Sequence, residues 1–300
     1  MKRFLFVLLT SYLILLDVAR AQNGILVFQS DFGLKDGAVA AMKGVALGVS
    51  PSLKIHDLTH EIPAYNVWEA AYRLVQTAPY FPKGTVFVSI CDPGVGTERK
   101  SVVMLTKSGH YFVTPDNGTL TLVAEQLGIQ EVREIDEEVN RRKNSQASYT
   151  FHGRDVYAYT GAKLAARVIG LAQVGGKQPN EVVRIPYQKA TVENNQVTGN
   201  IPVLDIQYGN VWTNIPKALF DRLNVKVGEK ITVQIFHQTE KVFEESMVYA
   251  NTFGQVPEGQ NLLYVNSLMN LSVAVNMGDF SEKYKVYSGA EWTIRVLLVK

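Results

Sequence analysis

Asp92 and Arg99 lie in the stretch CDPGVGTER, residues 91–99, whose residue types and spacing can support chemistry. Proline has no amide hydrogen, and glycine adopts backbone dihedrals that other residues avoid, so this stretch predicts an abrupt turn. The turn presents a carboxylate, bare backbone and, seven residues later, an arginine. A tight turn with a surface ion pair is the simpler interpretation, and it stays open on this stretch alone.

His152 is a second candidate, in the segment TFHGRD ahead of a helix predicted over residues 156–169. The dipole at a helix amino terminus disfavours the protonated imidazole, and a neutral imidazole is what a general base needs. Asp155 acts in the opposite direction, because a nearby carboxylate raises the pKa of histidine. A histidine at this place is also commonly only a cap, so both interpretations stand.

Two further polar loops follow predicted strands. Asp31 and Asp36 lie after a strand over residues 25–29, and Asp36 or a neighbour is predicted to cap the next helix. Asn117 lies in the turn PDNG, residues 115–118, between a strand and a helix. Because ligands of open α/β sheets bind at the carboxyl ends of the strands, these loops are candidate parts of one site.

His56 and His60 flank the end of the next predicted strand and raise a metal alternative together with Asp31 and Asp36. Histidines at strand ends are more often structural, and the sequence has no CxxC pair or HExxH helix, so no metal is expected. The single cysteine, Cys91, excludes an intramolecular disulfide and is expected to be a buried thiol.

These loops need a scaffold of strands and helices. Apolar, β-branched runs predict strands over 25–29, 53–58, 84–90, 101–106 and 111–114, and apolar periodicity predicts helices over 38–47, 67–76, 120–127 and 156–169. Their alternation indicates an α/β domain over residues 22–180, with a mixed or mostly parallel sheet and flanking helices. A polar segment over 181–200 predicts a linker. Short strands separated by turns over 201–300 indicate a smaller all-β barrel domain.

The first 21 residues have the pattern of a signal peptide. Lys2 and Arg3 precede an apolar run from residue 4 to 16, and Ala19-Arg20-Ala21 fits a cleavage site. The run is shorter than the roughly 20 residues that cross a bilayer, so we expect an exported protein, periplasmic or secreted, that begins at Gln22 and has no membrane anchor.

Charge and composition exclude some classes of protein. With 46% hydrophobic and 10% aromatic residues, the chain can form a sizeable core. The predicted signal carries three of the 30 basic and one of the 28 acidic residues, so 27 of each remain. The neutral remainder gives no indication of nucleic-acid binding.

Taken together in order, the motifs SDFG…D (30–36), DPGVGTxR (92–99), PDNG (115–118), FHGRD (151–155) and GNVWTN (209–214) resemble one known family. It is the family of S-adenosylmethionine (SAM) hydrolases, or hydroxide adenosyltransferases, relatives of the fluorinase and chlorinase enzymes. The resemblance implies an α/β domain, a β-barrel domain and a homotrimer with active sites between subunits. It also implies hydrolysis of SAM to adenosine and L-methionine without a cofactor.

The resemblance also implies a role for each of several residues. Preparation of the attacking water falls on Asp92, Arg99 and His152. The implied substrate contacts are Asp31, on the ribose hydroxyls; Asp36, Tyr65 and Asn117, in the first domain; Asp205 and Ser267, near the methionine part; and Tyr208, Asn210, Phe253, Val275 and Met277, around the adenine. Trp212 is either core or contact.

The sequence also departs from the family. Many of these hydrolases carry a glycine and a glutamate in the segment that reads NSLMNLS here, residues 266–272. The fluorinase pattern has tyrosine and serine at His152 and Gly153, and tyrosine at Asp92, which disfavours halogenation. An exported nucleoside-binding protein without turnover and a metal-dependent hydrolase stay open as alternatives.

Overall fold

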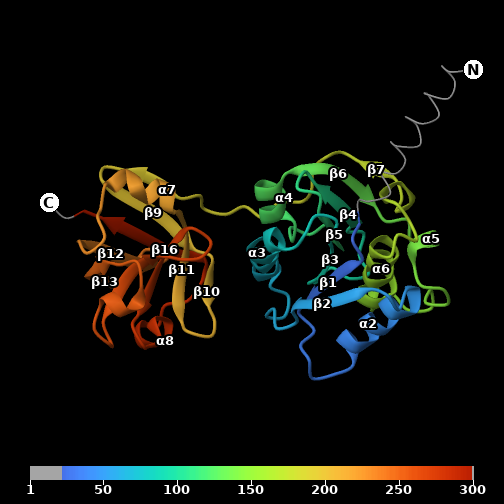
Figure 1. Cartoon of the computed structure of the whole chain (residues 1–300), viewed down its shortest axis with the longest axis horizontal. Helices are drawn as coiled ribbons and strands as arrows, with labels where there is room; N and C mark the ends of the chain where they lie inside the picture. Colours follow the sequence, from blue (N-terminus) through green and yellow to red (C-terminus); the bar gives the residue numbers. More distant parts are fainter. Residues whose placement is uncertain (1–21, 299–300) are drawn as a thin grey trace, which may run out of the picture. The chain divides into compact units, whose positions relative to one another are not determined.

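The computed structural model describes residues 22–298, which divide into two compact units between Ile185 and Pro186 (Figure 1). The predicted signal peptide, residues 1–21, lies outside the described residues. No helix of the described part is long and apolar enough to cross a membrane.

The elements of the first unit, in chain order, are β1 (Ile25–Ser30), α2 (Ala38–Val49), β2 (Lys54–Thr59), α3 (Val67–Thr77), β3 (Val86–Ile90), β4 (Ser101–Thr106), β5 (Tyr111–Pro115), α4 (Thr121–Leu127), β6 (Ile129–Glu134), α5 (Glu137–Asn140), α6 (Tyr159–Ala165) and β7 (Lys177–Gln178). Those of the second unit are β8 (Thr191–Glu193), β9 (Gln196–Ile201), β10 (Val203–Asp205), β11 (Asn210–Pro216), α7 (Lys217–Phe220), β12 (Lys230–His237), β13 (Glu240–Tyr249), β14 (Asn261–Val265), β15 (Asn270–Val275), α8 (Phe280–Tyr284) and β16 (Gly289–Leu297).

Within the described residues, the first unit has one seven-stranded sheet in the order β2-β1-β3-β5-β4-β6-β7. The pairs from β2 to β5 are parallel, whereas β4, β6 and β7 pair antiparallel. The predicted mixed sheet is therefore confirmed. The inner strand β3 is buried along its whole length, as expected for a strand covered on both faces.

Helices cover both faces of this sheet (Figure 1). Successive strand residues point to opposite faces, so Phe28 packs with α2 and α6 while Val27 packs with α3 and α4. α3 begins at a side-chain cap, in which Asn66 Oδ1 accepts a hydrogen bond from the Glu69 amide at 2.9 Å. With both faces covered by helices, the ends of the strands and their loops provide exposed backbone and polar groups.

α6 approaches the sheet closely at Gly161, where an added Cβ would lie 2.3 Å from Val88 Cγ2. We expect Gly161→Ala to lower the free energy of unfolding by about 1–3 kcal/mol, because the backbone of the helix must move away from β3. Gly44→Ala is the matched control, since Gly44 lies in α2 with open space at its Cβ. It should raise stability by about 0.5–1 kcal/mol. Denaturant titration measures both, and a neutral Gly161→Ala would contradict this packing.

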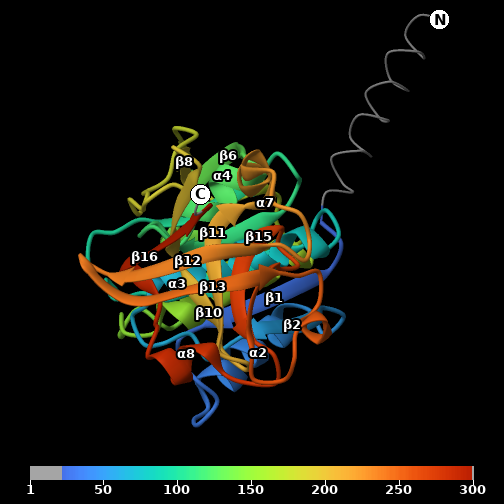
Figure 2. The same cartoon turned by 90° about the vertical axis from the view of Figure 1, so that its left-hand side faces the viewer.

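The second unit, in its described part, has a nine-stranded sheet in the order β10-β11-β15-β14-β13-β12-β16-β9-β8. The sheet curls, because β9 near one end contacts β11 near the other: the Asn200 amide donates to Asn214 Oδ1 at 2.8 Å. Figure 2 faces this unit, with the short helices α7 and α8 at opposite ends of it. The predicted sheet-rich second domain is confirmed, although the sequence did not predict these two helices.

Three local predictions differ from the structure. The helix predicted over 156–169 begins as a π-helical segment, Gly153–Ala158, and ends with α6 at Ala165. β6 was not predicted, because its sequence IQEVRE mixes charged and apolar residues on a partly exposed strand. β8 and part of β9 lie inside the predicted linker, 181–200, since short polar strands at or next to a sheet edge resemble loop sequence.

Candidate active site

Asp31 and Asp92 follow two neighbouring parallel strands. Ser30 at the end of β1 pairs with Ile90 at the end of β3, and the Asp31 amide donates to the Ile90 carbonyl at 3.2 Å. The chain that leaves β1 continues to β2 on one side, whereas the chain that leaves β3 continues to β4 and β5 on the other, so the two connections diverge here. Such a switch point, at the carboxyl ends of the strands, is where open α/β sheets bind ligands.

A cavity of about 270 Å³ lies at this point, and four of the predicted site residues line it: Asp31, Tyr65, Asp92 and His152. We call it the first-unit cavity. Its other lining residues are Phe32, Ala64, Ile90, Val95, Thr150, Phe151 and Gly153. Carboxylates, an imidazole and aromatic walls converge on one hollow, which is the usual composition of a small-molecule site.

Arg99 lies against Asp92. Its Nη2 contacts Asp92 Oδ2 at 2.5 Å, and its Nε lies 3.0 and 3.1 Å from the two carboxylate oxygens. The Asp92 and Arg99 side chains are only 5% and 12% exposed, so the surface ion pair of the simpler interpretation is wrong. The pair is buried and forked, a geometry that fixes the direction of the carboxylate.

His152 is held by its backbone surroundings. Its Nδ1 lies 3.0 Å from the Tyr149 carbonyl oxygen, which can only accept, so Nδ1 carries the proton and Nε2 is the free acceptor. Burial lowers the pKa of His152 below its ordinary value, and Arg99 and Arg141 act in the same direction, while Glu137 opposes them. Asp155 is instead paired with Arg142 and Arg154.

Gly153 lets the histidine segment approach the strand ends. A Cβ at this position would lie 3.1 Å from two ring atoms of Phe32 and 3.4 Å from Ile90 Cγ2. The rings of Phe32 and Phe151 meet edge to face, with centroids 5.8 Å apart. This packing places His152 beside the loop that carries Asp31.

Asp31 is oriented by the loop before α3. Its Oδ2 accepts from the Tyr65 amide at 2.9 Å and lies 3.7 Å from Cys91 Sγ. Tyr65 has φ +68°, a strained conformation for a residue with a side chain and one that is common at functional sites. Burial, with Asp31 nearby, raises the pKa of the Cys91 thiol, so it stays protonated as a structural donor.

Asp36 and Asn117 do not line the first-unit cavity. Asp36 Oδ1 accepts from the amide of Ala38, the first residue of α2, at 2.8 Å, while its neighbour Gly37 is the N-cap residue. Asn117 Nδ2 donates to the Cys91 carbonyl at 2.9 Å, and its oxygen accepts from Thr119. Asn117 therefore supports the turn that carries Asp92 from behind.

The two histidines of the metal alternative have other partners. His60 Nδ1 lies 2.7 Å from Ser30 Oγ, and its Nε2 lies 3.1 Å from Asp57 Oδ1. The His56 ring packs on Phe81. Over residues 22–298, no group of three or more His, Cys, Asp or Glu side chains is arranged to hold a metal ion.

A second cavity, of about 810 Å³, lies in the second unit, and all of the predicted residues of that unit line it: Asp205, Tyr208, Asn210, Phe253, Ser267, Val275 and Met277. We call it the second-unit cavity. Asn210 Nδ2 donates to Asp205 Oδ2 at 3.1 Å, and the Phe253 ring lies 5.0 Å from that of Tyr264. Trp212 also lines it while only 8% exposed, so it is both core and wall.

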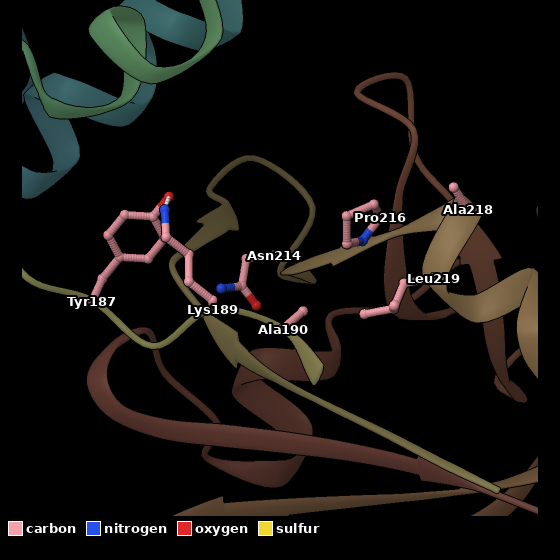
Figure 3. A pocket seen from close by; sticks show the side chains of 7 residues that line it. All are labelled: Tyr187, Lys189, Ala190, Asn214, Pro216, Ala218 and Leu219. Atoms are coloured by element: carbon pink, nitrogen blue, oxygen red, sulfur yellow. Dashed lines mark hydrogen bonds between the residues drawn. The ribbon is translucent and has the colours of Figure 1, made fainter. Parts of the chain in front are cut away.

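Figure 3 shows another hollow, of about 510 Å³, lined by Tyr187, Lys189, Ala190, Asn214, Pro216, Ala218 and Leu219. The Lys189 ammonium lies over the Tyr187 ring, and Asn214 Nδ2 donates to the Gln188 carbonyl at 2.6 Å. None of the predicted site residues lines this hollow, and its lining has no acid–base pair.

Some residues of the site were not predicted. Thr150 and Phe151 line the first-unit cavity, and their position next to His152 was the available signal. Tyr264 and Asn266 line the second-unit cavity from β14 and the turn after it. Glu137, whose Oε2 lies 3.6 Å from His152 Nε2, had no sequence signal, because it belongs to the acidic run DEE, residues 136–138, which is typical of an exposed surface.

The first unit is a mixed α/β domain with polar loops at its switch point, and the second is a curled sheet with an aromatic-lined cavity. Together they define a class of two-domain proteins that bind small molecules. The particular family follows from comparison with known proteins. Residues 26–175 match the SAM hydroxide adenosyltransferase N-terminal domain, and residues 199–293 match the C-terminal domain of the same family. The chain belongs to this family, which confirms the resemblance.

Its relatives include both branches of the family. The chain is 36% identical to an (R)-S-adenosyl-L-methionine hydrolase of Methanocaldococcus jannaschii, covering 88% of this chain and 96% of that protein. It is 30% identical to a fluorinase of Actinopolyspora mzabensis, covering 88% and 95%. The crystal structure of a conserved protein from Thermotoga maritima matches with a TM-score of 0.84 and 38% identity, covering 91% of this chain and all of that one.

Proposed function

We propose that this protein hydrolyses SAM to adenosine and L-methionine, by attack of water on the 5′ carbon of the ribose. The observation that carries the proposal is the first-unit cavity, where Asp31, Asp92 and a neutral His152 line one hollow. Arg99 does not line this cavity and acts on it through its buried ion pair with Asp92. Relatives named as SAM hydrolases support the substrate.

The chemistry requires an activated nucleophile and no acid. When the bond from carbon 5′ to sulfur breaks, its electrons neutralise the sulfonium, and a thioether leaves without needing a proton. Water, with a pKa of about 15.7, is the weak partner. His152 Nε2 is free to accept its proton, while Asp92 and Arg99 orient the water. Holding oxygen and carbon in line contributes up to about 7–11 kcal/mol.

The substrate contacts divide between the two cavities. In the first unit, Asp31 would accept hydrogen bonds from the ribose hydroxyls, which are donors that match carboxylate oxygens. In the second unit, Tyr208, Asn210 and Phe253 would surround the adenine, with backbone near Val275 and Met277, and Asp205 and Ser267 would bind the methionine part. These roles come from the family resemblance.

Activity should fall at low pH. His152 works as a base only when unprotonated, and burial places its pKa below 6.5. We therefore expect kcat/KM to be flat above that pKa and to fall about tenfold per pH unit below it. A pH profile of initial rates measures this limb. A limb centred above pH 6.5 would contradict a buried, neutral imidazole as the base.

The proposed activity is tested by product analysis. Purified protein lacking residues 1–21 is incubated with SAM, with and without a chelator, and adenosine and methionine are separated by chromatography. We expect both products in equal amounts, with no effect of the chelator. Tight adenosine binding without products would indicate a binding protein. Loss of activity with the chelator would indicate a metal enzyme, and formation of a halogenated adenosine in halide buffer would indicate a halogenase.

Export and assembly belong to the same proposal. We expect cleavage after Ala21, supported by the basic, apolar and small-residue segments before it. Sequencing the amino terminus of the protein recovered outside the cytoplasm should give Gln22. The family resemblance supports a homotrimer, so light scattering should give three times the mass of the mature chain, and a monomer that is fully active would contradict it.

A further inference from the structure

Glu137 has its two carboxylate oxygens directed at different parts of the site. Oε1 accepts from Ser101 Oγ at 3.5 Å. Oε2 lies 2.8 Å from Arg141 Nη1 and 3.6 Å from His152 Nε2. The side chain is one third exposed, so it connects the buried site with solvent.

Ser101 connects Glu137 to Arg99. Arg99 Nη1 donates to Ser101 Oγ at 3.1 Å, and the Tyr157 hydroxyl lies 3.0 Å from the same oxygen. Ser101 Oγ donates its one proton to Glu137 Oε1, so the Tyr157 hydroxyl is the donor in its contact with Ser101. A hydroxyl has two lone pairs and one proton. The two lone pairs of Ser101 therefore accept from Arg99 and Tyr157, and its proton is directed at Glu137.

Arg141 holds Glu137 from the other side. It is almost fully buried, donates to Ser145 Oγ at 3.1 Å and to the Ser148 carbonyl at 2.7 Å, and stacks on the Tyr149 ring at 4.5 Å. A guanidinium fixed by this many partners leaves the carboxylate little freedom. Glu137 is therefore set in one orientation beside His152 before any substrate arrives.

We propose that Glu137 is a positioning residue of the hydrolytic reaction, whose carboxylate stabilises the imidazolium that forms when His152 Nε2 takes a proton from water. The inference rests on the proposed function. In this step a water O–H bond breaks, its proton goes to Nε2, and the oxygen lone pair forms the new bond to carbon 5′. The bond from carbon 5′ to sulfur breaks with its electrons on sulfur. The proton then leaves to solvent past Glu137.

The distance of 3.6 Å fits this role. Neutral Nε2 presents a lone pair, which does not attract a carboxylate, so the two groups stay beyond hydrogen-bond distance in the free protein. Once protonated, Nε2 becomes a donor and a charged partner for Oε2. The interaction therefore strengthens as the positive charge develops, which is the condition for lowering a barrier.

The test measures the titration of His152 itself. The charged groups that face its ring are Glu137, Arg99 and Arg141, with the Tyr149 carbonyl at Nδ1. Glu137→Gln leaves the two arginines unopposed, so the pKa of His152 should fall by about one unit. Nitrogen-15 NMR of the ring nitrogens follows the five histidines, and the signal missing from His152→Gln identifies the one of interest.

The same variants are assayed for turnover. In Glu137→Gln, kcat should fall about tenfold or more and the acid limb should move to lower pH with the NMR titration. Glu137→Asp keeps the charge but moves it away from His152, so both changes should be present and smaller than in Glu137→Gln. Glu138→Gln removes an equal charge from the next, exposed residue and should change neither.

An unchanged His152 titration and pH limb in folded Glu137→Gln would overturn the proposal. If that variant does not fold, Glu137→Asp decides instead. Its carboxylate is retracted, so the pKa of His152 should still fall, by less than in Glu137→Gln. An unchanged pKa of His152 in Glu137→Asp would then overturn the proposal. The NMR titration needs no substrate. If the native protein showed no SAM hydrolysis while Glu137→Gln still lowered the pKa of His152, the proposed function and the chemical step would be overturned. Only the interaction between Glu137 and His152 would be left.

Discussion

Replacing His152 with alanine is expected to lower kcat by about 10²-fold or more, the contribution typical of a positioned general base. The structure gives the physical reason, because Nδ1 is committed to the Tyr149 carbonyl and Nε2 is left as an acceptor in a hollow shared with Asp92. Among the described residues, no other histidine lines that cavity. KM should change little, since the imidazole is proposed to act on water and not on the nucleoside.

The control for this prediction is His56→Ala, which removes a histidine that packs on Phe81 outside the cavity. It should keep turnover within about twofold, as expected for a change away from the reacting groups. Adenosine binding, followed by calorimetry, should survive in both variants. If His152→Ala turned over at the rate of the native protein, the base would have to be another group.

Replacing Arg99 with alanine should affect both stability and turnover. Asp92 is 5% exposed and receives two nitrogens of Arg99, so the substitution leaves a buried carboxylate without its partner. Removing one member of a buried pair typically costs about 3–5 kcal/mol. Turnover should also fall by about 10²-fold or more, because a lone carboxylate loses its fixed direction and the guanidinium charge is gone.

A double variant separates these two effects. Arg99→Met with Asp92→Leu removes both charges and keeps apolar volume, and such replacements of buried pairs are often neutral for stability. We expect denaturant titration to show recovery of most of the stability lost in Arg99→Ala, while turnover stays as low. Recovery of turnover along with stability would mean that the pair only supports the fold.

Strands that are buried and apolar could be predicted from the sequence. The run from Ser101 to Thr106 is found as β4 with the predicted bounds, because it is covered on both faces. β6 and β8 could not be predicted, because partly exposed strands at or near the edge of a sheet carry the charges and turn residues that also characterise loops. The π-helical segment, Gly153–Ala158, depends on packing against Phe32 and Ile90, which local sequence does not encode.

The site could be predicted in part. The sequence indicated a tight turn at Asp92 and placed His152 ahead of a helix, and both residues line one cavity in the structure. The residues of the second-unit cavity came from the family resemblance, since nothing in their spacing indicates that they share a hollow. Glu137 was missed because its partners are 36 residues before it and 15 after it, and only the fold brings them together.

The most direct measurement of the central claim is the fate of the oxygen atom. Hydrolysis of SAM in water enriched in oxygen-18 is followed by mass spectrometry of both products. Attack of water on the ribose 5′ carbon predicts one heavy oxygen in adenosine and none in methionine. Heavy oxygen in the amino acid product, or adenosine formed without the label, would contradict the proposed reaction.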